Sequence, residues 1–223
     1  MIDATATAVE LRARQSLGSS EHAIYQALAN ALRRRGASGV LADIGCGAGH
    51  LWRELQPLFS RCIGVDAVRY AGLPADIEFQ QADLDRVPLP LPDASADAVI
   101  AVETIEHLEN PRAFCRELHR VVRPGGWIVV TTPNQLSVLS LLTLIVKQRF
   151  SAFQDVAYPA HRTALLEIDL RRIASECGLA AVELLYTGSG RLPLSAAHYP
   201  AALSRMFPRA LSDNVLLIGR RRD

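Results

Sequence analysis

A glycine-rich turn near the start of the chain constrains its fold more than any other feature. Residues 40–50 read Val-Leu-Ala-Asp-Ile-Gly-Cys-Gly-Ala-Gly-His. A short apolar run that ends in an acid predicts a buried strand, and the glycines let the backbone turn sharply and lie against a ligand. The start of the helix predicted over 51–58 presents unpaired N–H groups. Strand, turn and helix together predict a nucleotide-binding turn at the carboxyl edge of a sheet.

The rest of the chain alternates between predicted strands and helices. Strands are predicted at 40–44, 62–65, 77–80, 98–102, 127–132, 181–186 and 214–218, and helices over 21–35, 51–58, 111–122 and 164–177. Ser19 or Ser20 can cap the first helix, Pro124-Gly125-Gly126 separates the third helix from the strand at 127–132, and 87–92 reads as a surface loop. This alternation predicts an α/β fold with a doubly wound parallel sheet. At 223 residues, we expect one domain over 1–223 with an apolar insert at about 134–162.

The glycine pattern distinguishes between two cofactor classes. A dinucleotide fingerprint requires glycine or alanine three residues after Gly47, where His50 stands, so an NAD oxidoreductase ranks last. The pattern D-x-G-x-G-x-G from Asp43 instead resembles the class I methyltransferases that use S-adenosylmethionine. This resemblance covers most of the chain. It implies a Rossmann-like, mostly parallel seven-stranded sheet that ends in an antiparallel C-terminal hairpin.

Acids at the ends of predicted strands extend the cofactor site. Asp66 ends the second strand, where a carboxylate can accept hydrogen bonds from both ribose hydroxyls; the structural alternative is a cap of the next turn. The resemblance assigns the adenine amino group to Asp83, which could also be an ordinary loop acid, and the methionine ammonium to Asp43. The predicted cofactor site comprises Asp43, Gly45, Cys46, Gly47, Gly49, Asp66, Ala67, Asp83, Leu84, Val102 and Glu103.

A cluster of acids and histidine follows the strand at 98–102. It reads Glu103-Thr104-Ile105-Glu106-His107, and in a helical turn Glu103, Glu106 and His107 would share one face. These groups suit a divalent metal, with His161 completing the set. Alternatively, neutral His107 or His161 takes a proton from a hydroxyl, with Glu106 holding the tautomer. A third interpretation is a loop that caps the next helix. We take His107, His161 and Glu106 as catalytic candidates; the metal site is not favoured.

Two groups of methyltransferases share this cluster. The ubiquinone-biosynthesis O-methyltransferases resemble the chain in this loop and in a later His after an apolar insert. The small-RNA 3′-end 2′-O-methyltransferases use a similar Glu-x-x-Glu-His set to hold a metal. The Arg162-Thr163-Ala164 that follows His161 departs from the RNA pattern, and a net charge of +1 counts against a nucleic-acid partner. The resemblance therefore favours the ubiquinone-like branch.

The apolar run at 136–146 lies within the insert and is shorter than the roughly 20 residues that cross a bilayer. We favour a helix that lies over the active site as a lid. The alternative is a peripheral membrane contact through 136–150, with Lys147, Arg149 and Phe150 at the headgroups. Both interpretations imply an apolar or amphiphilic acceptor.

The sequence thus predicts a methyltransferase that uses S-adenosylmethionine to methylate oxygen on a small or lipid-linked acceptor. The alternatives are a metal-dependent RNA 2′-O-methyltransferase and a non-catalytic partner protein of the same fold, against which the intact acids of the cofactor site argue. Four scattered cysteines, with no Cys-x-x-Cys pair, predict reduced thiols in a cytoplasmic protein, membrane-peripheral if the insert docks. No motif specifies the acceptor or the oligomeric state.

Overall fold

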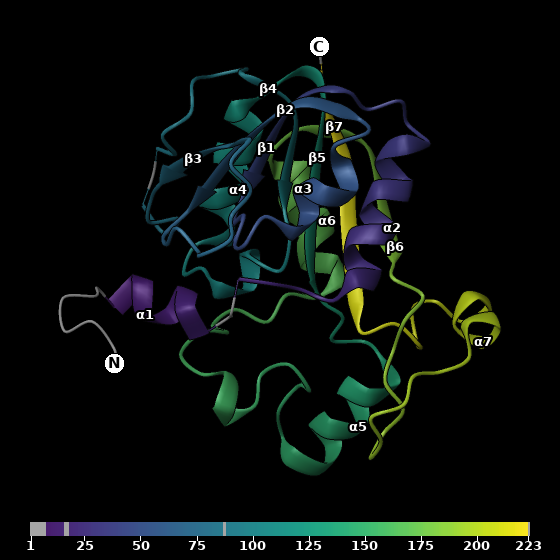
Figure 1. Ribbon diagram of the computed structural model, residues 1–223. Coiled ribbons are helices and arrows are strands. Elements are labelled where there is room, and N and C mark those ends of the chain that lie inside the picture. Colours follow the sequence, from purple (N-terminus) through teal and green to yellow (C-terminus); the bar gives the residue numbers. More distant parts are fainter. Residues whose placement is uncertain (1–7, 16–17, 87, 223) are drawn as a thin grey trace.

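In the part of the chain that the structure describes, seven strands form one sheet in the order β3-β2-β1-β4-β5-β7-β6 (Figure 1). The computed structural model describes residues 8–15, 18–86 and 88–222. The strands are β1 (Gly39–Ile44), β2 (Phe59–Asp66), β3 (Ile77–Gln81), β4 (Ala96–Ala101), β5 (Val122–Pro133), β6 (Leu179–Tyr186) and β7 (Asn214–Arg221). The pairs that involve β7, with β5 and with β6, are antiparallel, and the other pairs are parallel, so β7 alone runs opposite to the other strands. The predicted fold class is confirmed.

Helices cover both faces of this sheet. α2 (His22–Arg33) and α3 (His50–Leu55) pack on one face, and α4 (Pro111–Val121) and α6 (Glu167–Glu176) pack on the other. The remaining elements lie toward the carboxyl ends of the parallel strands (Figure 1): α1 (Ala8–Gln15), η1 (Ile105–His107), α5 (Val138–Lys147), η2 (Asp155–Ala157) and α7 (Ala201–Met206). That edge therefore carries nearly all of the irregular structure.

Alternate residues of each central strand point into different cores. In β1, Leu41 packs with Leu28 and Leu32 of α2, whereas the next residue, Ala42, packs with Phe114 and Leu118 of α4. All six side chains are at most 1% exposed. Because both faces are buried, the strand reads as continuously apolar, as expected for a parallel sheet.

The predicted element boundaries shift where tertiary pairing extends or shortens an element. The helix predicted over 51–58 ends at Leu55, and the helix predicted over 164–177 begins at Glu167. The strand predicted from Trp127 begins at Val122, because Val122 pairs with Ala96 and the Pro-Gly-Gly segment is accommodated by a register shift within the strand. That segment therefore lies inside β5 and does not launch it.

Two local predictions are wrong. The segment at 88–92 is not purely a surface loop, because Leu89 and Leu91 are buried and Arg120 donates to both of their carbonyl oxygens. Val87 lies outside the described residues. Neither serine caps α2, whose N-cap is Glu21 without a side-chain bond. The Ser20 N–H donates instead to the Tyr25 hydroxyl at 2.8 Å.

The boundaries of the domain stay a prediction, and residues 1–7, 16–17, 87 and 223 of the predicted 1–223 lie outside the described residues. Among the described helices, none combines the length and apolar character that crossing a bilayer requires.

Candidate active site

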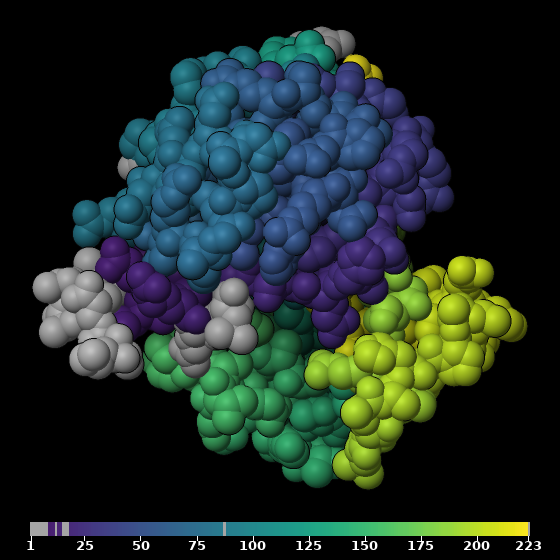
Figure 2. All heavy atoms as spheres, in the orientation of Figure 1, coloured from purple at the N-terminus to yellow at the C-terminus, as the bar shows by residue number. Residues whose placement is uncertain are grey.

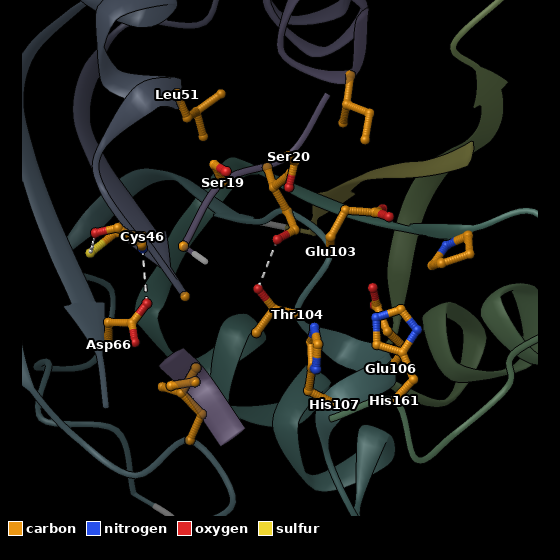
Figure 3. Close-up of a pocket in the computed structure, with 18 of the residues that line it drawn as sticks. Ser19, Ser20, Cys46, Leu51, Asp66, Glu103, Thr104, Glu106, His107 and His161 are labelled. Carbon is orange, nitrogen blue, oxygen red and sulfur yellow. Dashed lines mark hydrogen bonds between the residues drawn. The ribbon is translucent and has the colours of Figure 1, made fainter. Parts of the chain in front are cut away.

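The carboxyl ends of β1, β2 and β4 open into a cavity of about 610 Å³ (Figure 3). Every residue of the predicted cofactor site except Gly49 lines this cavity, and so do Glu106, His107 and His161. Parallel strands end at the same edge of a sheet, which explains why residues so distant in sequence meet there.

The glycine turn after β1 is closed by the segment that precedes α2. Gly47 has a φ of +52°, and a Cβ at this position would meet the carbonyl oxygen of Gly18. That oxygen also accepts the Ala48 N–H at 2.8 Å. Only glycine allows this close crossing of two backbones. The crossing places Ser19 and Ser20 on the wall of the cavity.

Gly49 has a different place from the other predicted glycines. A Cβ there would lie 2.7 Å from both Ile77 Cδ1 and Pro74 Cδ, and the residue is the left-handed N-cap of α3. Gly49 therefore shapes the packing of α3 against the β3 side, and the structure does not bring it to the cavity wall.

Asp66 holds the glycine turn from the neighbouring strand. Its Oδ2 accepts the Gly47 N–H at 2.8 Å and its Oδ1 accepts the Val68 N–H at 3.2 Å. Burial raises the pKa of this carboxyl, and the backbone donors oppose the rise. The turn-capping interpretation and the ligand interpretation are thus compatible, since a carboxylate oxygen has room for more than one donor.

Asp43 carries a polar atom without a partner. Its side chain is buried at 1% exposure, and Oδ2 makes no hydrogen bond. Burial, and next the negative charge of Asp66, raise the pKa of Asp43 to about 7. A buried carboxylate without a donor is costly, so a cationic group beside it would be bound favourably. The residues present therefore fit the ammonium of a bound amino-acid-like cofactor.

Asp83 lines the far end of the cavity and also stabilises its own loop. Its Oδ1 accepts the Asp85 N–H at 3.1 Å, and Oδ2 lies 3.4 Å from Arg86 Nε. Both interpretations that the sequence allowed, a cofactor contact and a loop acid, are compatible with this position.

Glu103 connects the cofactor end of the cavity to the last strand. Its Oε1 accepts the Thr131 hydroxyl at 2.9 Å, and its Oε2 accepts Asn214 Nδ2 at 2.7 Å. Burial raises its pKa, and these two donors oppose the rise. Glu103 has a φ of +46° and lies outside η1. The helical turn that a face shared with Glu106 and His107 would require is therefore not formed at Glu103.

The insert is clamped onto η1 by its backbone. The N–H groups of Arg162 and Thr163 both donate to the carbonyl oxygen of Glu106 at 2.9 Å. This pairing brings His161 beside His107, with 4.8 Å between the centroids of the two rings (Figure 3). Two residues that are 54 positions apart thus form one cluster with Glu106.

Backbone carbonyls fix the tautomer of both histidines. His107 Nδ1 bonds the Ala160 oxygen at 2.9 Å, and His161 Nδ1 bonds the Ala152 oxygen at 2.6 Å. A carbonyl only accepts, so each Nδ1 carries the proton and Nε2 is the basic nitrogen when the ring is neutral. The prediction that Glu106 sets the tautomer is therefore wrong. Burial also lowers the pKa of His161, which keeps its ring neutral near pH 7.

Glu106 is the most buried acid of the cluster. It is 0% exposed, its Oε2 accepts the Thr132 hydroxyl at 3.2 Å, and its Oε1 has no partner. Burial, and next the charge of Glu103, raise its pKa well above the usual range. A bound donor or cation would satisfy the orphan oxygen.

Three of the four residues of the hypothetical metal set come together. Ligand atoms of Glu106, His107 and His161 lie within 4.8 Å of one another, whereas Glu103 is engaged elsewhere. Histidines that donate Nδ1 to a carbonyl are oriented as metal ligands usually are, and equally as general bases. The geometry alone permits both uses.

The apolar insert does not form the lid that the sequence led us to favour. No residue of α5 lines the cavity; from the insert, Ser151, Ala152 and His161 do. Among the α5 side chains, only Ser140 is buried. The helix is therefore directed away from the active site.

Several cavity residues carried no recognised motif. Tyr25 comes from α2 and Asn214 from the start of β7. Thr131 and Thr132, at the end of β5, do not line the cavity, but their hydroxyls donate to Glu103 and Glu106, which do. Strand ends at the carboxyl edge are the signal that could have identified the two threonines. Asn214 could have been found from the expected antiparallel C-terminal hairpin, because a strand that runs antiparallel to the others begins at this edge.

Comparisons with known proteins agree on one family. Residues 42–130 match the model of the methyltransferase domain. A probable S-adenosylmethionine-dependent methyltransferase of Mycolicibacterium smegmatis is 29% identical over 196 residues, which is 85% of this chain and 70% of that protein. A ubiquinone biosynthesis O-methyltransferase of Maricaulis maris is 29% identical over 114 residues, which is 47% of this chain and 44% of that protein.

The fold also matches solved structures. A methyltransferase of Thermotoga maritima, described as a possible histamine N-methyltransferase, superposes with a TM-score of 0.64 at 18% identity. The match covers 95% of this chain and 92% of that one. At this identity, the likeness extends to the fold alone.

Proposed function

We propose that this chain, which belongs to the class I S-adenosylmethionine-dependent methyltransferases, methylates a hydroxyl oxygen of a small or lipid-linked acceptor. The observation that carries the proposal is the pair of imidazoles beside buried Glu106. Both have Nδ1 on a backbone carbonyl, and both line the cavity that contains the predicted cofactor residues.

The cofactor residues have separable roles in this proposal. Asp43 receives the ammonium of the cofactor, Asp66 its ribose hydroxyls and Asp83 its adenine amino group. The cofactor supplies a methyl group on a positively charged sulfur, which is a good leaving group. The turn at Gly45 and Gly47 brings backbone close to the ligand, and this positioning provides most of the rate gain.

A hydroxyl must lose its proton as its oxygen takes the methyl group. We assign the acceptance of this proton to Nε2 of His161 or His107, because a neutral imidazole at pH 7 is a competent base. Glu106, with one oxygen unpaired, would accept a hydrogen bond from the acceptor or orient its hydroxyl. The proton leaves on imidazole, and no covalent enzyme intermediate forms.

The charges around the cavity support a neutral acceptor. Among the described residues that line the cavity, the one guanidinium is that of Arg191, whose Nε is paired with Asp213 at 2.6 Å. The described lining residues therefore offer no unpaired guanidinium or ammonium to an acceptor with its own negative charge, whereas a neutral hydroxyl compound fits. The similarity to a ubiquinone biosynthesis O-methyltransferase supports an apolar ring or chain on it.

Methyl-labelled S-adenosylmethionine tests the proposal directly. The purified protein is incubated with lipid, polar-metabolite and small-RNA fractions, each with and without EDTA. We expect label in the lipid or metabolite fraction, unaffected by EDTA, in a product that is stable as a methyl ether. Label in RNA that EDTA abolishes would contradict the proposal and make Glu106, His107 and His161 a metal site.

A further inference from the structure

The helix α5 turns its apolar side chains toward solvent. Leu141 and Leu142 are 39% and 46% exposed, and Ile145 and Val146 are 71% and 79% exposed. A surface helix normally buries its apolar stripe against the core. α5 instead buries Ser140. Its exposed apolar surface is therefore available to something outside the described chain.

A second exposed apolar segment lies next to α5. Leu194 is fully exposed, and Met206 and Phe207 of the α7 region are 71% and 54% exposed. The two segments are joined, because the Val138 N–H donates to the Ala210 oxygen at 2.8 Å. Figures 1 and 2 show α5 and the segment around α7 on the same lower side of the molecule. We call these residues the docking face: Leu141, Leu142, Ile145, Val146, Leu194, Met206 and Phe207.

Within the segments that carry the docking face, the charged side chains all have one sign. The two segments that carry it, 134–151 and 190–212, contain five basic residues and no Asp or Glu, in a chain whose net charge is +1. The basic residues are Lys147, Arg149, Arg191, Arg205 and Arg209. Three of them are paired with acids from outside the two segments, Arg149 with Asp155, Arg191 with Asp213 and Arg209 with Glu167, and Lys147 and Arg205 are not part of these pairs. Basic residues that border apolar ones complement an anionic lipid surface.

We propose that the docking face binds the surface of an anionic phospholipid membrane. Its apolar side chains enter the headgroup region, and Lys147 and Arg205 lie at the level of the lipid phosphates. α5 has 10 residues, so it lies along the surface: crossing the bilayer takes about 20 residues. This binding does not depend on the identity of the acceptor.

The position of the docking face connects membrane binding to the active site. Ser151 and Arg191 line the cavity, and each lies within one of the two segments that carry the face. A membrane bound there would lie beside the opening of the cavity, so that an amphiphilic acceptor could pass between bilayer and active site. This consequence, unlike the binding, rests on the proposed function.

Vesicle flotation tests the binding. We expect the purified protein to float with vesicles that contain phosphatidylglycerol, and much less with vesicles of phosphatidylcholine alone. The double variant Ile145→Glu/Val146→Glu should lower partitioning at least about tenfold, and Lys147→Glu should lower it less. Arg34→Glu, which makes the same charge change beyond the end of α2 at the opposite edge of the sheet, should bind as wild type does.

Each result has a defined meaning. Absence of wild-type protein from both floated fractions, or undiminished flotation of the double variant, would overturn the proposal. A concentration-dependent dimer that the double variant abolishes, without vesicle binding, would assign the face to a second copy instead. All variants should bind S-adenosylhomocysteine as wild type does, because no residue of α5 lines the cavity. Failure of the membrane test therefore leaves the proposed methyl transfer untouched.

Discussion

The two ends of the cavity are built in different ways. The cofactor end comes from three neighbouring strands, β1, β2 and β3, each with its functional residues at or just after its carboxyl end. The acceptor end combines η1, the insert and the start of β7, which are joined by hydrogen bonds between residues far apart in sequence. The residues of the cofactor end thus lie in short local segments (the locally encoded end), whereas the acceptor end forms only through contacts between segments far apart in sequence (the assembled end).

This difference separates the effects that mutations should have. The residues predicted to bind the cofactor lie in short segments at or just after the strand ends, so their substitution should change cofactor affinity. Residues of the acceptor end that do not bond Glu103 should change turnover while cofactor affinity stays constant. Measuring kcat together with the Kd for S-adenosylhomocysteine therefore tests the comparison at every position.

The largest effect is expected at His161. His161→Ala should lower kcat by about 10²–10⁴, the usual contribution of a general base. Cofactor affinity should not change. Since burial lowers the pKa of this imidazole, wild-type turnover should persist at pH values where an ordinary histidine is already protonated. Turnover should fall only below that lowered pKa.

Two controls accompany this variant. His119 lies on α4, away from the cavity lining, and His119→Ala should be neutral. If His161→Ala keeps wild-type turnover and His107→Ala does not, the proton goes to His107. If both single variants and the double variant keep it, neither histidine is the base.

The next largest effect should be seen at the cofactor end. Asp66→Ala removes the acceptor predicted for two ribose hydroxyls and leaves the Gly47 N–H without its partner. With charge-assisted hydrogen bonds worth about 1.5–3 kcal/mol each, affinity for S-adenosylhomocysteine should fall at least tenfold. Isothermal titration measures it, with Asp85→Ala as a control on the same wall. If Asp66→Ala binds S-adenosylhomocysteine with wild-type affinity, the assignment of this end of the cavity to the cofactor is wrong.

The same contrast explains how much the sequence could predict. Asp43 and Asp66 could be located because each follows a short apolar run, and Asp83 because of the family resemblance; the parallel topology then fixes their common edge. The contact between His107 and His161 could be suspected but not oriented, because the tautomers depend on the carbonyls of Ala160 and Ala152.

Two further failures have the same origin. An apolar run such as α5 has the same pattern whether a protein core or a bilayer is to cover it, so the lid was favoured wrongly. The helical turn expected at 103–107 fails because Glu103 is held in the left-handed region by partners on β5 and β7. Tertiary contacts, which a local pattern does not contain, decide both cases.

A third prediction concerns pH and Asp43, whose Oδ2 makes no hydrogen bond. Its pKa is raised to about 7 in the folded protein, from an ordinary value of 3.8. Between these values the folded state binds more protons than the unfolded state, so stability falls as pH rises. Asp43→Asn should therefore stabilise the ligand-free protein above pH 7 by about 2 kcal/mol, part of the roughly 4 kcal/mol that three pKa units represent.

The gain should disappear toward acid pH. Thermal melts of Asp43→Asn and wild type should converge as the pH falls through 3.8, below which Asp43 is protonated in both the folded and the unfolded state. The variant should also bind S-adenosylhomocysteine more weakly than wild type, since the amide no longer attracts an ammonium. A gain in stability that is equal at all pH values would show that packing, and not the carboxylate charge, is responsible.

The smallest effect is expected where the two ends of the cavity meet. Asn214 donates to Glu103 Oε2, so the first residue of β7 holds the loop after β4. Asn214→Ala removes one hydrogen bond to a carboxylate and should weaken cofactor binding about tenfold or less. It should also raise the pKa of Glu103 further, because the Asn214 donor opposes the rise caused by burial.

Asn214→Asp is the sharper variant, because it places a second carboxylate against Glu103 and should weaken binding more than alanine does. If both variants change turnover as well as cofactor affinity, Glu103 couples the locally encoded end to the assembled one. If neither variant changes cofactor affinity or turnover, the two ends act separately and the hydrogen bond only stabilises the sheet.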